Sequence, residues 1–136
     1  MSKIKFFTAV VLCVCLSLSA LCIYAQEPDI SPYNIAIIST DLSFSINSTG
    51  VASCYGSVSV RAGYTVRLVM QLQQKGSMWK TVQSWNGTDS AVVAFDETYQ
   101  VEKGYEYRLM NVYIAYDADG NQVEAFYDTS NIVEYK

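Results

Sequence analysis

The chain has 136 residues, of which 51% are hydrophobic and 16% charged, and it contains no histidine. A chain of this length forms one domain at most. Without an imidazole, Ser-His-Asp and Cys-His nucleophile pairs and His-ligated metal sites are excluded. The net charge of -4 and the lack of a basic run predict that nucleic acid is not a partner.

Residues 1–25 have the pattern of a secretory signal peptide. Lys3 and Lys5 supply positive charge, an apolar run from Phe6 to Ile23 follows, and the sequence becomes polar directly after Ala25. We therefore expect cleavage after Ala25 and a secreted, extracellular protein that is not attached to the membrane after cleavage. An uncleaved anchor is the alternative, because the apolar run is close to the shortest length that spans a bilayer.

Beyond residue 32 the chain has no proline, and from Leu42 onward apolar and polar residues alternate with a period of two. This period is typical of strands with one buried face, and no helical period is sustained. The runs that predict strands are residues 42–46, 52–60, 64–72, 79–85, 91–101, 105–116 and 123–127, with a further short run at 132–135. Turn signals separate them, including Asn86-Gly87 after the fourth run. The run 105–116 is apolar on both faces, so the sequence does not assign its inner side.

Export would remove three of the four cysteines and leave only Cys54. A single cysteine cannot form an internal disulfide, so we expect the mature domain to be held by its hydrophobic core. Cys54 shares its side of the second run with Ala52, Gly56, Val58 and Val60. This placement predicts a small buried hydrophobe rather than a reactive thiol or an intermolecular disulfide.

Seven short strands without helices between them predict an all-β fold. We expect an antiparallel two-sheet sandwich of immunoglobulin or fibronectin-III-like type over residues 39–136, preceded by an extended segment at 26–38. A closed barrel is the less favoured alternative. Tyr105 or Tyr107, directly after the Lys103-Gly104 turn, occupies the position of a tyrosine corner.

The run from Asp117 to Asn121 carries alternating oxygen side chains, which raises the possibility of a calcium loop. Gly120 is fourth in this run, whereas an EF-hand loop needs glycine sixth and a glutamate twelfth, where Asp128 stands. We therefore interpret the run as a hairpin turn, and we expect no metal and no cofactor.

Close pairs of carboxylates of the kind that glycoside hydrolysis needs are Asp96-Glu97 and Asp117 with Asp119. Neighbours on a strand point to opposite faces, which argues against a joint role for Asp96 and Glu97. Because no acid, base or nucleophile can be located, we expect the protein not to be an enzyme.

Trp79 and Trp85 are the candidate binding residues. They are an even number of positions apart and would project on the same side of an uninterrupted strand. Two indoles on one face could stack on sugar rings or anchor a protein partner. The alternative is that one or both pack into the core.

Further short motifs carry a resemblance to a known group of proteins. They are Ala52-Ser53-Cys54, Leu72-Gln73-Gln74-Lys75, Trp79-Lys80-Thr81-Val82 with Trp85, Gly104 with Tyr107-Arg108, Tyr116-Asp117, and Gly120 with Val123-Glu124. With them, residues 42–136 resemble a family of short secreted proteins of mostly Gram-positive gut anaerobes, classed as a domain of unknown function. The resemblance implies a sandwich and export, and it carries over no catalytic residue. Asn111 and Tyr113 depart from it, because smaller or apolar inward residues are expected there.

The sequence therefore predicts a secreted, non-enzymatic β-sandwich that serves as an extracellular or cell-surface interaction module. Its partner would be an extracellular protein or a glycan. A carbohydrate-binding module that uses Trp79 and Trp85 is the alternative.

Overall fold

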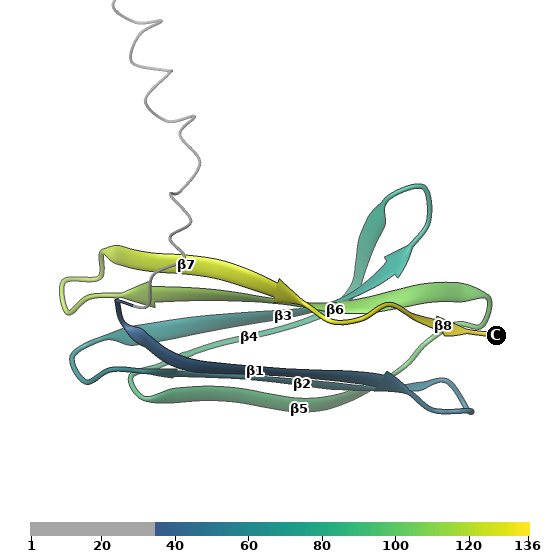
Figure 1. Cartoon of the computed structure of the whole chain (residues 1–136), viewed down its shortest axis with the longest axis horizontal. Coiled ribbons are helices and arrows are strands. Elements are labelled where there is room, and N and C mark those ends of the chain that lie inside the picture. Colours follow the sequence, from purple (N-terminus) through teal and green to yellow (C-terminus); the bar gives the residue numbers. More distant parts are fainter. Residues whose placement is uncertain (1–34) are drawn as a thin grey trace, which may run out of the picture.

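The computed structural model describes residues 35–136, and these form two antiparallel β-sheets that lie face to face (Figure 1). One sheet has the order β1-β2-β5 and consists of β1 (Ile37–Ile46), β2 (Val51–Val60) and β5 (Val92–Gln100). The other has the order β4-β3-β6-β7 and consists of β4 (Trp79–Asp89), β3 (Thr65–Lys75), β6 (Tyr105–Tyr116) and β7 (Gln122–Thr129). A short strand, β8 (Val133–Tyr135), also pairs with β6. The prediction of an all-β antiparallel sandwich is confirmed.

The predicted signal peptide at residues 1–25 lies outside the described residues. The first described strand starts at Ile37, inside the segment that the sequence assigns to an extension, and Ala36 and Ile37 are both buried. Within residues 35–136 the structure contains no helix of the length and apolarity needed to cross a membrane.

The alternating pattern places the core where the sequence predicts it. On β2 and β3, every second side chain is buried between the sheets, and these residues are Ala52, Cys54, Gly56, Val58 and Val60 on β2 and Val66, Leu68, Met70 and Leu72 on β3. Each of the two sheets is covered by the other on one face, so β2 and β3 have one inner face and one outer face. Period two therefore suffices to assign their inner face.

The inner face of β6, which the sequence leaves open, consists of the odd-numbered residues. These are Tyr107, Leu109, Asn111, Tyr113 and Ala115, and all are buried. The even-numbered positions Met110, Val112 and Ile114 lie on the outer face, where they line a shallow apolar groove with Ala125 and Tyr127 of β7. Because the outer face of β6 also carries apolar side chains, the alternation of apolar and polar residues could not identify its inner face.

Asn111 is a polar side chain in the centre of the sandwich, and a glycine on the opposite sheet gives it room. A Cβ atom at Gly56 would lie 2.5 Å from the Asn111 Nδ2 atom. Asn111 Nδ2 donates to the Tyr113 hydroxyl at 3.4 Å, and Tyr113 packs against Phe126 with ring centroids 5.0 Å apart. The amide of Asn111 is therefore accommodated by the missing side chain on β2.

The predicted turn at Asn86-Gly87 is wrong, because β4 continues through both residues to Asp89 and Leu68 pairs with Gly87. Gly87 lies opposite Phe95 of the other sheet, and a Cβ atom there would lie 3.1 Å from the Phe95 ring. The glycine allows a close approach of an aromatic ring rather than a change of direction.

Glu124 of β7 holds the start of β1. It is 2% exposed, and its Oε2 atom accepts hydrogen bonds from the backbone N–H groups of Ile35, Ala36 and Ile37 at 3.0, 2.8 and 3.2 Å. Three donors that converge on one carboxylate oxygen form charge-assisted bonds, which are stronger than neutral ones. Glu124 thereby joins the first strand of one sheet to the edge strand of the other.

We expect Gly56→Ala to destabilise the domain by about 1–3 kcal/mol, because the new methyl group overpacks against Asn111. In an Asn111→Ala background the same change should be less unfavourable by about 1 kcal/mol or more, since the colliding amide is gone. Urea unfolding of the two single variants and the double variant measures this difference. Ser53→Ala, at an exposed position of the same strand, is the control with an effect of about 0.5 kcal/mol or less. Strictly additive effects would contradict the assigned contact.

We expect Glu124→Ala to lower the free energy of unfolding by about 2–4 kcal/mol, because three backbone donors lose a charged acceptor. Glu124→Gln retains one carbonyl oxygen and should have a smaller effect. Hydrogen exchange at the Ala36 and Ile37 amides should accelerate in both variants, whereas Glu134→Ala, which removes an exposed carboxylate, should leave it unchanged. Unchanged protection of these amides in Glu124→Ala would refute the role of the carboxylate.

Candidate functional site

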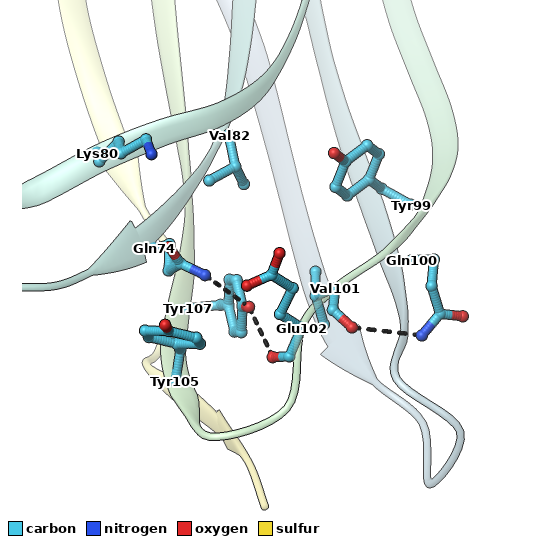
Figure 2. A pocket seen from close by; sticks show the side chains of 9 residues that line it. All are labelled: Gln74, Lys80, Val82, Tyr99, Gln100, Val101, Glu102, Tyr105 and Tyr107. Carbon is cyan, nitrogen blue, oxygen red and sulfur yellow. Dashed lines mark hydrogen bonds between the residues drawn. The ribbon is translucent and has the colours of Figure 1, made fainter.

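A pocket of about 310 Å³ opens at one end of the sandwich, between the edge strands β4 and β5. Figure 2 shows the side chains that line it, which come from β3, β4, β5, β6 and the β5–β6 connection. They are Gln74, Lys80, Val82, Tyr99, Gln100, Val101, Glu102, Tyr105 and Tyr107. The volume lies at the lower end of the range of about 300–1,000 Å³ found for small-molecule sites.

Tyr107 fixes the floor of the pocket. Its ring is buried in the core, its hydroxyl donates to the Glu102 carbonyl at 2.7 Å, and it accepts a hydrogen bond from Gln74 Nε2 at 2.9 Å (Figure 2). A tyrosine early in this strand that binds backbone a few residues upstream makes the contact of a tyrosine corner. The sequence offered Tyr105 or Tyr107 for this position, and the structure selects Tyr107.

Glu102 is bound through its backbone, so its side chain is left to the pocket. The carboxylate extends between Val82, Gln74 and the Tyr107 ring, and the Tyr99 hydroxyl points into the same space from β5 (Figure 2). Lys80 lies at the rim on β4. Neither Lys80 nor Glu102 has an ion-pair partner among residues 35–136.

An irregularity in β4 brings Lys80 and Val82 to this pocket. The register between β3 and β4 shifts between Leu72 and Gln73, so that Leu72 pairs with Gln83 but Gln73 pairs with Thr81. The extra residue, Val82, reverses the side to which the preceding side chains point. Lys80 therefore shares the inner side with its partner Gln74, and the tip of the β3–β4 hairpin bends away from the two sheets (Figure 1).

The same shift separates the two tryptophans. Trp85 pairs with the buried Met70 and packs against the core. Trp79 instead pairs with Lys75 on the outer side. The Arg108 guanidinium carbon lies over the Trp79 ring, 4.2 Å from the ring centroid. The expectation that the two indoles share one face is wrong, because the predicted strand is interrupted. They do not form a common platform, and binding by either one alone stays a prediction.

The pocket could not be predicted from the sequence, because its residues lie in segments whose patterns indicate only strands and turns. Glu102 belongs to a predicted turn, and Tyr99 and Tyr107 belong to predicted strands. The signal that could have drawn attention to them is the tyrosine corner position, since a tyrosine there orders the connection that precedes it. The β4 irregularity has no glycine or proline to mark it.

The run from Asp117 to Asn121 forms the predicted hairpin turn. The Asp117 carboxylate accepts hydrogen bonds from the backbone N–H groups of Asp119 and Asn121 at 3.0 and 2.9 Å, and Gly120 has a φ of 82°. The carboxylate is thus engaged by the backbone of its own loop. In the described part of the chain, no three Cys, Asp or Glu side chains are grouped so that they could hold a metal ion.

Cys54 is buried in the core, as the sequence predicts. Burial raises the pKa of its thiol to about 12, and the negative charge of Glu97, its cross-strand partner on β5, contributes to the rise. A thiol of this pKa carries almost no thiolate at neutral pH, so it is a poor nucleophile.

In comparisons with known proteins, no family model matches the chain and no curated protein gives a match. The resemblance to secreted proteins of unknown function stays a prediction.

The raised pKa of Cys54 predicts a loss of stability at alkaline pH. The ordinary pKa of the thiol is 9.0 and its pKa in the folded protein is about 12. The contribution of the neutral thiol to the free energy of unfolding is therefore fully present below pH 9 and declines as the pH rises toward 12. Within that window the free energy of unfolding should fall by about 1.4 kcal/mol per pH unit more steeply than in Cys54→Ala. Burial also raises the pKa of Tyr113, but both proteins share this effect. Urea unfolding of both proteins across the window measures the difference, and parallel pH profiles would exclude it.

Proposed function

We propose that this protein is exported and acts outside the cell as a non-enzymatic binding module, and that its site is the pocket between β4 and β5. The observation that carries the proposal is the position of Glu102, whose backbone secures the fold while its carboxylate extends into a tyrosine-lined pocket. Because Glu102 contributes to the fold through its backbone carbonyl, its side chain is available to a ligand. The pocket is lined mainly by polar side chains, and polar groups that converge on a concave site can fix the orientation of a ligand.

Binding without chemistry is supported by the composition of the pocket. Glu102 is the single carboxylate among its lining residues, whereas glycoside hydrolysis by acid and base requires two. The sequence contains no histidine to act as a base. The partner would therefore be a glycan or an extracellular protein that is held and not converted.

We further infer that the sandwich is of immunoglobulin or fibronectin-III-like type. The strand orders β1-β2-β5 and β4-β3-β6-β7 and the hydrogen bond from Tyr107 to the Glu102 carbonyl support this inference. Leu109, two residues after Tyr107, stands where such domains with an inter-sheet disulfide carry their second cysteine, and it lies in the same core cluster as Cys54.

The proposal can be tested on the secreted form, purified from the medium of an expressing bacterial culture, where its mass should place the first residue at Gln26. ¹H–¹⁵N correlation spectra would be recorded with maltotriose, triglycine and adenosine as probes. We expect one of them to shift the amide signals of Lys80, Tyr99 and Glu102 in a saturable manner, because these residues line the pocket. Lys80→Ala should weaken that binding, whereas Lys103→Ala removes a neighbouring charge outside the pocket and should not. Absence of shifts with all three probes, or shifts centred elsewhere, would refute the assigned site.

A further inference from the structure

We infer that the pocket between β4 and β5 takes a neutral sugar ring, an inference that rests on the proposed function and specifies its ligand. The groups that line the pocket include hydrogen-bond donors and acceptors that the fold does not use. Gln74 donates through Nε2 to Tyr107, and no hydrogen bond within residues 35–136 engages its Oε1 atom. Gln100 donates through Nε2 to the Thr49 and Val101 carbonyls, and its Oε1 atom points away from the other lining side chains (Figure 2). Lys80 and the Tyr99 hydroxyl are donors that face the same space (Figure 2).

This mixture fits hydroxyl groups better than it fits a ligand with one kind of polar group. A sugar hydroxyl both donates and accepts, so neighbouring hydroxyls can bind a carboxylate on one side and an ammonium group on the other. Hydrogen bonds to charged partners are the strong ones, and Glu102 can accept from two hydroxyls at once. A pocket lined by one positive and one negative group is therefore well matched to a polyol.

The charge balance of the pocket selects a neutral ligand. Lys80 supplies one positive charge and Glu102 one negative charge, and the remaining lining residues are uncharged. The chain as a whole carries a net charge of -4, which repels anions at long range. An acidic sugar would bring a carboxylate to a pocket that already holds one.

The lining of the pocket is mainly polar, and the rings of Tyr99 and Tyr105 are the aromatic groups in it that can contact the C–H face of a pyranose. Tyr105 is 41% exposed at the mouth of the pocket, and Tyr99 lies half-buried on the opposite side. Tyrosine offers a flat apolar face together with a polar end. With a volume of about 310 Å³, the pocket suits one or two sugar rings rather than a long chain.

The test is a titration of the secreted form with neutral trisaccharides, namely maltotriose, cellotriose and triacetylchitotriose, against trigalacturonic acid and triglycine. Binding is followed by ¹H–¹⁵N spectra and calorimetry. At least one neutral trisaccharide should bind and shift the signals of Tyr99, Glu102 and Tyr105, whereas the acidic trisaccharide should bind at least about tenfold more weakly.

Four variants locate the site. Glu102→Ala keeps the backbone carbonyl that Tyr107 needs, so it should leave the fold intact and weaken sugar binding by about tenfold or more. Tyr105→Ala should weaken it by about threefold to tenfold, and Tyr105→Phe should restore it because the ring returns. Tyr127→Ala, which removes a tyrosine that is 59% exposed on the outer face of β7, is the matched control and should change nothing.

The outcomes separate this inference from the proposed function. Triglycine binding in the pocket without sugar binding would overturn the sugar and leave the binding module standing. Absence of pocket shifts with every probe would overturn both. Sugar binding that survives Glu102→Ala and Tyr105→Ala but is lost in Trp79→Ala would place the sugar on the outer face and overturn the inference.

Discussion

The Tyr107 hydroxyl is the group on which the candidate site depends, because its two hydrogen bonds join three separate segments. It donates to the carbonyl of Glu102 in the β5–β6 connection and accepts from Gln74 of β3, while its ring is anchored in the core by β6. A buried phenol requires such partners, since an unpaired hydroxyl in an apolar environment is unfavourable. The connection therefore crosses from one sheet to the other in a defined position, and the Glu102 side chain has a fixed starting point at the pocket.

The second requirement is the extra residue in β4, which exchanges the side chains on the two faces of this strand. In an uninterrupted strand Trp79 would point inward with Trp85, and Lys80 would point to solvent. With Val82 inserted, Trp79 leaves the inner side and packs under Arg108, and Lys80 takes the inner side beside Gln74. Bulges bend the strand that carries them and redirect single side chains, and they are frequent next to functional sites. A shift of one position in register thus places Lys80 instead of Trp79 on the inner side of β4, beside the pocket.

The fold could be predicted where one face of a strand is apolar and the other is polar, as on β2 and β3. Prediction failed where local pattern and distant contact disagree. Asn86-Gly87 has the composition of a turn, but the glycine leaves room for the Phe95 ring of the opposite sheet. The outer face of β6 is apolar at Met110, Val112 and Ile114, so alternation could not choose between its faces. Asn111 is tolerated only because Gly56, far away in the sequence, lacks a side chain.

The candidate site was beyond prediction for a related reason, since it is assembled from groups that play two roles. Glu102 serves the fold with its carbonyl while its carboxylate lines the pocket, and Gln74 donates to Tyr107 with its amide nitrogen and also lines the pocket. Side chains of this kind look like ordinary turn and strand residues in a sequence. The division has a physical consequence: the carboxylate at position 102 can be exchanged without removing the bond that orders the connection. The scaffold can therefore retain its stability while the polar lining of the pocket is changed.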